Sequence, residues 1–194
     1  RLADAEPVSR EALEIRRRAL PADHPDVAAS LNNLASLLQA QGKLADAEVL
    51  YRDSLGICRR SLPAEHLATA AASNNLALLL KDEGNFVEAE QLYREALRIY
   101  RKALPSGHRA IATTLHNLAS LLQDSGRLDE AEPLYKEALE ARISKLGPRA
   151  APTTQTASAL ATLLARSGRS QEAAALRTTH GLEGPSGVPA TSPR

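Results

Sequence analysis

The stretch LNNLASLLQAQG, residues 31–42, decides the fold of this 194-residue chain. Its Leu and Ala side chains recur three and four positions apart, which places them on one face of an α-helix. Gly42 then suits the left-handed conformation in which many helices end. The pattern returns every 42 residues, and the same glycine recurs as Gly84, Gly126 and Gly168. Self-similarity at a fixed period of this length predicts a repeat array instead of a single globule.

A second helix follows the first in each unit. The pair Ala47-Glu48 and the nearby Tyr51 recur at the same 42-residue period. Glu48 and Arg52 lie four positions apart, in the order that stabilises a helix. A Leu-Pro pair such as Leu62-Pro63 separates one unit from the next. We therefore expect each unit to be a hairpin of a helix A and a helix B, with the pairs at 25–41 and 44–61, 67–83 and 86–103, and 109–125 and 128–145.

Hairpins of this kind cannot cover their own apolar faces and must stack on one another. The expected fold class is all-α, an α-solenoid of stacked antiparallel helical hairpins in a right-handed superhelix. Leu34, Leu76 and Leu118 are expected to be buried between helices A and B. The expected organisation is a partial repeat with helix B only at 1–20, repeats at 21–62, 63–104 and 105–146, a degenerate or capping repeat at 147–180, and a disordered tail at 181–194.

Charge and cysteine content narrow the expected partners. The chain has 24 Lys+Arg and 23 Asp+Glu, a net charge of +1. This balance gives no electrostatic reason to expect nucleic acid or an anionic membrane as a partner. No apolar stretch approaches the ~20 residues that cross a bilayer. Because the single cysteine, Cys58, cannot form an internal disulfide, a reducing compartment such as the cytoplasm is expected.

The residues of the repeat resemble a known family. The pattern L-N-N-L-A-x-L-L-x-x-x-G followed by A-E-x-L-Y, seen at Leu31–Leu55 and in large part at Ser73–Leu97 and Leu115–Leu139, resembles the tetratricopeptide repeat. The 42-residue period and His-Pro-Asp-Val-Ala at His24–Ala28 resemble the repeats of kinesin light chains and their relatives. The resemblance covers roughly residues 1–176. It implies a peptide-binding groove lined by helix A.

The resemblance maps the groove onto particular residues of helix A. Asn side chains carry a donor and an acceptor, and a row of them can pair with an extended peptide backbone. We expect Asn32, Asn74, His116 and Lys81 to be exposed along one groove, with Lys81 favouring a ligand that has a carboxylate. Asn33, Asn75 and Asn117 line the groove or tie each hairpin to the backbone of the next repeat. The expected groove residues are Asn32, Asn33, Ser36, Gln39, Asn74, Asn75, Lys81, Thr113, His116, Asn117, Ser120 and Gln123.

Three histidines, His24, His66 and His108, recur at the repeat period. Equivalent positions on packed helices lie about 8–10 Å apart, whereas zinc requires nitrogen ligands at about 2.0–2.1 Å. One ion cannot be shared by three such residues. We therefore expect these side chains to cap or pack at the start of helix A, and we expect no metal site.

The sequence contains no Gly-rich phosphate loop, no H-E-x-x-H and no C-x-x-C. Cys58 has no His partner at helical spacing, which favours an inert thiol; its register is shared by Arg16, Tyr100 and Arg142. We therefore expect no enzyme and no cofactor. The expected function is a non-enzymatic scaffold that binds an extended protein or peptide segment in the concave groove. The alternative is a sensor or autoinhibitory array of a larger signalling protein, with intramolecular contacts and a nucleotide-binding module outside this fragment.

Overall fold

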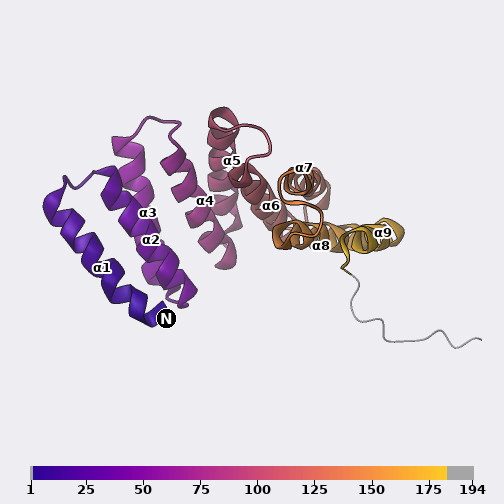
Figure 1. The fold of residues 1–194 in the computed structure, drawn as a ribbon, viewed down its shortest axis with the longest axis horizontal. Coiled ribbons are helices and arrows are strands. Elements are labelled where there is room, and N and C mark those ends of the chain that lie inside the picture. The colour runs from indigo at the N-terminus through magenta and orange to yellow at the C-terminus, as the bar shows by residue number, and fades with distance from the viewer. Residues whose placement is uncertain (1, 183–194) are drawn as a thin grey trace, which may run out of the picture.

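The computed structural model describes residues 2–182, and these residues are all helical apart from the connections. The described part of the chain contains nine helices and no strand (Figure 1). The residues of the expected disordered tail from 183 onward lie outside the described residues. The helices are α1 (Leu2–Ala19), α2 (Pro25–Ala40), α3 (Leu44–Ser61), α4 (Leu67–Asp82), α5 (Phe86–Ala103), α6 (Arg109–Asp124), α7 (Leu128–Leu146), α8 (Ala151–Arg166) and α9 (Ser170–His180).

The even-numbered helices are the A helices of the repeat, and the odd-numbered helices are the B helices. The six helices from α2 to α7 begin and end within one residue of the positions expected from the sequence. Helices α8 and α9 form a fourth hairpin, in which α9 has 11 residues whereas α3 and α5 have 18. Helix α1 packs on α2 as a B helix without an A helix among the described residues.

Histidine side chains start three of the four A helices. The Nδ1 atoms of His24, His66 and His108 each accept a hydrogen bond from the backbone N–H two residues later, at 3.1 Å. This contact satisfies one of the unpaired donors at a helix N-terminus. The predicted capping role is therefore confirmed. Each A helix then ends before a glycine in the left-handed conformation, as at Gly42 with φ of 78°.

The core runs between the A and B helices along the whole array. Leu34, Leu76 and Leu118 are each 1 % exposed, as predicted from the sequence. Alanines allow the helices to approach closely, and Ala35 and Ala47 are fully buried together with their equivalents in the other hairpins. One tyrosine fills the same place in each of three hairpins, as Tyr51, Tyr93 and Tyr135. Few aromatic residues are therefore enough, because each is used at the same position.

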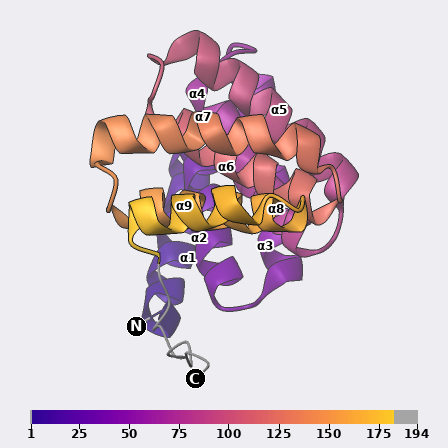
Figure 2. The same ribbon diagram turned by 90° about the vertical axis from the view of Figure 1, so that its right-hand side faces the viewer.

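The stacking places the A helices on the inner side of the array. The B helices α3, α5 and α7 each pack against the A helix of their own hairpin and against the A helix of the next. Consecutive A helices approach one another closely, whereas the backbones of consecutive B helices do not. The helix axes also turn along the stack. In Figure 1, α3 is seen from its side and α7 nearly end-on, whereas in Figure 2 α7 is seen from its side. The α-solenoid therefore curves with its A helices on the concave face.

Candidate functional site

The expected groove residues lie on the A helices, but most of them are less exposed than expected. Asn33 and Ser36 on α2 are exposed. The expectation that Asn32, Asn74, His116 and Lys81 are exposed is wrong, because all four are partly buried. The other partly buried groove residues are Gln39, Asn75, Thr113, Asn117, Ser120 and Gln123.

Hydrogen bonds between neighbouring A helices explain this burial. The Nδ2 of Asn75 donates to the Oδ1 of Asn32 at 3.1 Å, joining α4 to α2. The Oγ1 of Thr114 donates to the Oδ1 of Asn74 at 3.0 Å, joining α6 to α4. Asn32 and Asn74 therefore tie repeats together. Of the three asparagines considered for such ties, Asn75 makes one, and its partner is a side chain of the preceding repeat instead of backbone of the next.

His116 makes the equivalent connection between α6 and α8. Its Nδ1 lies 3.2 Å from the Oγ1 of Thr156. Its ring meets that of Tyr135 edge to face, with ring centres 5.5 Å apart. Burial, together with the nearby charges of Arg142 and Lys81, lowers the pKa of His116 to about 4. The imidazole is therefore neutral near pH 7 and acts as a polar contact at the junction.

Lys81 forms an ion pair within the array. Its Nζ lies 2.9 Å from a carboxylate oxygen of Asp124, and its side chain is 17 % exposed. Lys81 is near the end of α4 and Asp124 is at the end of α6. Because its charge is already paired with Asp124, Lys81 does not favour a ligand carboxylate, contrary to the expectation.

One register of the B helices lies beneath the A helices, and at each of the three junctions between consecutive A helices a residue of this register forms the floor. This register holds Arg16, Cys58, Tyr100 and Arg142, and the last three are buried. Arg142 donates from Nη1 to the carbonyl oxygen of Pro152 at 2.7 Å and to the Oγ1 of Thr156. Arg16 makes the equivalent contacts, with the carbonyl oxygen of Asp26 and the Oγ of Ser30. We call these four residues the floor residues.

The floor residues were not among the residues expected to line the groove. The sequence shows them as one register of the B helices at which the residue type changes from repeat to repeat. The A-helix residue 14 positions later carries a hydroxyl at three of the four registers and is alanine at the fourth. Arg16 and Arg142 meet the hydroxyls of Ser30 and Thr156, whereas Cys58 is followed at the same spacing by Ala72 and Tyr100 by Thr114. Each junction therefore has its own floor chemistry while its helical frame stays constant.

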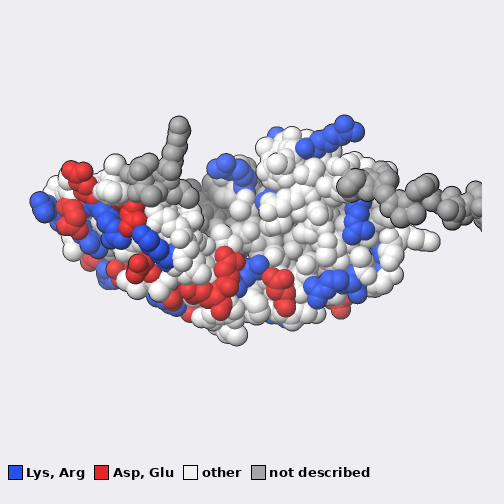
Figure 3. Space-filling model, turned by 90° about the horizontal axis from the view of Figure 1, so that it is seen from below, with Lys and Arg blue, Asp and Glu red and all other residues white. Residues whose placement is uncertain are grey.

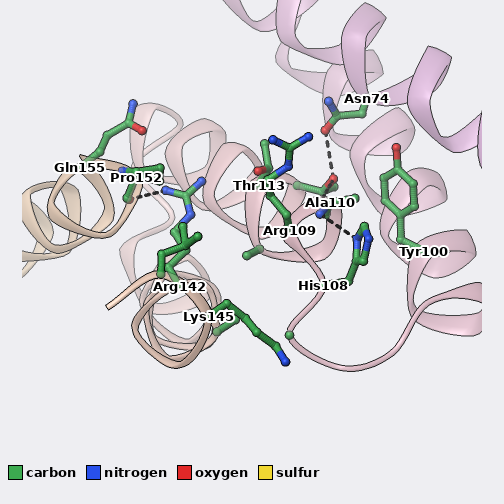
Figure 4. A pocket seen from close by; sticks show the side chains of 15 residues that line it. Asn74, Tyr100, His108, Arg109, Ala110, Thr113, Arg142, Lys145, Pro152 and Gln155 are labelled. Atoms are coloured by element: carbon green, nitrogen blue, oxygen red, sulfur yellow. Dashed lines mark hydrogen bonds between the residues drawn. The ribbon is translucent and has the colours of Figure 1, made fainter. Parts of the chain in front are cut away.

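Two cavities open at these junctions. The first, between α2 and α4, has a volume of about 150 Å³ and is lined by Ala29, Asn32, Cys58 and Ala71 among others. The second has a volume of about 520 Å³ and extends from Asn74 and Tyr100 to Arg142 and Gln155 (Figure 4). Many of its lining residues lie 42 or 84 positions after residues that line the first cavity. Asn74 and Tyr100 are 42 positions later, at the junction of α4 and α6, and Arg142 and Gln155 are 84 positions later, at the junction of α6 and α8. The larger cavity is thus two neighbouring junction pockets merged.

The larger cavity is lined by cations and by no acidic residue. Arg109 from α6 and Arg142 and Lys145 from α7 are among its lining residues, and none of the described lining residues is Asp or Glu. Figure 4 shows the Arg142 side chain rising between α6 and α8, with one nitrogen directed to Pro152. The local charge therefore differs from the near balance of the whole chain.

A family model described as tetratricopeptide repeat matches residues 1–60, 27–102 and 110–176. The chain belongs to the tetratricopeptide repeat family. Solved structures that resemble the chain include kinesin light chain-like repeat proteins. No curated protein matches the chain.

Two solved structures illustrate this similarity. One is a kinesin light chain-like protein of Podosopora anserina with nearly identical TPR-like repeats; it has a TM-score of 0.78 and 25% identity, over 93% of this chain and 86% of that one. The other is BtubC (BKLC) from P. vanneervenii, with a TM-score of 0.80 and 25% identity, over 100% of this chain and 80% of that one. The resemblance to this group that the repeat pattern indicated is therefore confirmed.

The convex side of this tetratricopeptide array carries ion pairs between consecutive B helices. Arg127 bonds Glu90 at 2.5 Å and Arg169 bonds Glu132 at 2.7 Å, each across 37 residues. Further pairs join Arg52 to Glu88, Arg59 to Glu95 and Arg101 to Glu137, each across 36 residues. Figure 3 shows acidic and basic side chains interleaved toward the N-terminal end of the array. These arginines are therefore paired with carboxylates.

None of the helices within residues 2–182 is long and apolar enough to cross a membrane. No group of three or more His, Cys, Asp or Glu side chains in this range is arranged to hold a metal ion. Burial raises the pKa of the Cys58 thiol, which keeps it in the less reactive protonated form.

Proposed function

We propose that this chain is a non-enzymatic scaffold that binds an extended peptide or protein segment on the concave face formed by α2, α4, α6 and α8. Tetratricopeptide arrays are generally protein interaction scaffolds, and this fold is typically non-enzymatic. The recurrence of the same pocket at successive A-helix junctions carries the proposal. We further propose that the scaffold acts in the cytoplasm and binds neither nucleic acid nor membrane.

The spacing of the junctions supports an extended ligand. Packed helices lie about 8–10 Å apart. A peptide in the polyproline II conformation returns to the same face after three residues, or about 9 Å. Every third side chain of such a peptide therefore meets a new junction. Asn33 and Ser36 are exposed beside the first pocket and offer polar groups to the peptide backbone.

Blocking the groove tests the proposal. The probe is a library of random decapeptides with acetylated and amidated ends, from which binders are selected on the unmodified chain. The variant Asn33→Arg with Ser36→Arg places two long side chains on the concave face. A matched control, Gln91→Arg with Gln171→Arg, adds the same charge at exposed positions of the B helices α5 and α9.

We expect the groove variant to bind the selected peptides about tenfold more weakly or worse, a loss of at least about 1.4 kcal/mol. The control variant should bind as the unmodified chain does, and both should keep the same helical circular dichroism. Equal binding by all three proteins would place the binding surface outside the groove. Capture of no peptide by the unmodified chain would contradict the function itself.

A second candidate function is the sensor or autoinhibitory array of a larger signalling protein. The apolar side of α1 favours it. Ile15 is 59 % exposed, whereas Ile57 and Ile99 at the same register are 6 % and 0 % exposed because helices of the array cover them. A helix from elsewhere in a larger protein would cover Ile15 in the same way. A nucleotide-binding module encoded in the same polypeptide would support this function, and its absence from the complete gene product would count against it.

A further inference from the structure

Arg142 is a buried cation with donors left over. It is 6 % exposed, and its described hydrogen bonds all leave from Nη1, toward Pro152 and Thr156. Its Nε and Nη2 have no acceptor among residues 2–182. Figure 4 shows that Nη1 points to Pro152, so that the opposite edge of the guanidinium faces the space between α6 and α8. Arg142 is among the residues that line the larger cavity.

No carboxylate of the described chain compensates this charge. The arginines of the convex face, such as Arg127 and Arg169, each bond a glutamate. Arg142 forms no ion pair among the described residues, and neither do Arg109 and Lys145, which line the same cavity at exposed positions. A buried charge without a partner is costly. Burial accordingly lowers the pKa of Arg142, and no acidic neighbour raises it. An anion from outside would offset this cost.

We propose that the part of this cavity at the junction of α6 and α8 binds the carboxylate of an Asp or Glu side chain of the peptide, with Arg142 as the residue that determines this specificity. The inference rests on the proposed function of the groove. The free Nε and Nη2 edge presents two parallel N–H donors, the arrangement that matches the two oxygens of a carboxylate. Arg109 and Lys145 at the rim attract the same charge over a longer distance.

The other junctions differ at the floor and should select other side chains. Cys58 and Ala72 make the junction of α2 and α4 narrow and uncharged, with room for a small apolar side chain in its cavity of about 150 Å³. Tyr100 lies under the junction of α4 and α6, beside Thr114. The floor residue therefore determines the specificity of each junction, and the acidic preference belongs to the junction above Arg142.

Because Tyr100 and Arg142 are both followed 14 positions later by Thr, each can be replaced by the other while the combination of floor residue and Thr still occurs in the native chain. Arg142→Tyr beside Thr156 recreates the pair Tyr100 and Thr114. Tyr100→Arg beside Thr114 recreates the pair Arg142 and Thr156. A third variant, Arg109→Ala with Lys145→Ala, changes only exposed side chains. It therefore tests the cavity without a substitution in the core.

The probe is a set of end-blocked decapeptides selected on the unmodified chain, each carrying Glu, Gln or phosphoserine at one scanned position. We expect one position at which Glu binds roughly ten- to a hundredfold more tightly than Gln, as for hydrogen bonds to a charged group. Arg142→Tyr should abolish this preference. Tyr100→Arg should create a second preferred position about three residues away. The rim variant should lower the preference roughly two- to fivefold.

The outcomes separate this inference from the proposed function. Binding of peptides without any preference for Glu over Gln overturns the carboxylate site but leaves the scaffold intact. A preference that survives in Arg142→Tyr, with helical circular dichroism retained, assigns it to another residue and overturns the role of Arg142. If Arg142→Tyr does not fold, the other two variants decide. The role of Arg142 is also overturned if Arg109→Ala with Lys145→Ala leaves the preference for Glu unchanged and Tyr100→Arg creates no second Glu-preferring position. Tighter binding of phosphoserine than of Glu replaces the carboxylate by a phosphate. Binding of no peptide at all removes the proposed function and this inference with it.

Discussion

The hydroxyl of Tyr51 donates a hydrogen bond to the Oε1 of Gln39 at 3.0 Å, inside the first full hairpin. Tyr93 occupies the same position in the next hairpin and is fully buried, but its hydroxyl finds no partner among residues 2–182. The reason is two changes of residue on α4. Lys81 stands at the register of Gln39 and pairs with Asp124 instead, and Leu78 stands where the first hairpin has Ser36.

This difference makes the same substitution harmful in one hairpin and harmless in the next. Tyr51→Phe removes a satisfied hydrogen bond and should lower the free energy of unfolding by about 1 kcal/mol. Tyr93→Phe removes a buried hydroxyl without a partner and should leave stability unchanged or raise it. Urea unfolding followed by circular dichroism measures both variants. A larger loss for Tyr93→Phe than for Tyr51→Phe would show that the Tyr93 hydroxyl is hydrogen-bonded after all.

Stability should be graded along the array. Leu76 is 1 % exposed in a hairpin with neighbours on both sides, and Leu76→Ala should cost about 2–5 kcal/mol. Leu160 is buried to a similar degree, at 3 % exposure, but it lies in the last hairpin, whose helix α9 is short. Because terminal units can unfold locally, Leu160→Ala should cost less in global denaturant titrations. Equal losses at both sites would show that the described array unfolds as one uniform unit.

His116 should make the array sensitive to mild acid. Its pKa is lowered from 6.5 to about 4 in the folded chain, mainly by burial. The unfolded chain therefore binds a proton at higher pH than the folded chain does, and stability falls as the pH drops from 6.5 toward 4. Between pH 6.5 and 5 this loss should reach about 1–2 kcal/mol. Thermal unfolding at each pH measures it.

The repeat supplies a matched variant for this measurement. Asn32 and Asn74 hold the register of His116 at the preceding junctions, so His116→Asn keeps a polar group there and removes the titration. The variant should lose less stability than the unmodified chain between pH 6.5 and 5. Parallel pH profiles of the two proteins would assign the acid sensitivity to other groups.

The ion pairs of the convex face should also lose their contribution to stability in acid, but at a lower pH than His116 does. Hydrogen bonds from Lys136 and then Arg169 lower the pKa of Glu132. A lowered carboxylate pKa stabilises the fold above about pH 4.5 and loses this effect as the pH falls through the folded value. Glu132→Gln should therefore cost about 1 kcal/mol at pH 7 and less at pH 3 or in 1 M NaCl. A cost independent of pH and salt would indicate packing instead of charge.

Local patterns made much of the fold predictable. The helix bounds follow from apolar spacing and from glycines such as Gly42, and the capping by His24 follows from its place directly before a helix. These features depend on residues within one hairpin. Because the sequence repeats every 42 residues, a feature predicted for one hairpin is predicted for the others as well.

The groove was predicted less well because it depends on how closely the hairpins approach one another. The period places Asn32 and Asn74 on the A-helix face, but their burial is set by the distance between A helices and by the partner across it, Asn75 or Thr114. Lys81 was misjudged for the same reason, since Asp124 lies on another helix. The depth of Arg142 likewise follows from packing and not from its spacing in the chain.

Neighbouring repeats are joined by short side chains on the concave face and by long side chains on the convex face, and this difference has a mechanical consequence. Short, directional contacts such as Asn75 with Asn32 bind the inner rims of neighbouring repeats, whereas long side chains such as Arg127 and Glu90 span the outer side. Flexible side chains tolerate changes of span that short amide contacts do not. When the solenoid flexes, the outer rim therefore takes up most of the strain and the inner rim acts as its hinge line. The distances between neighbouring pockets then stay nearly fixed while the curvature of the whole array changes.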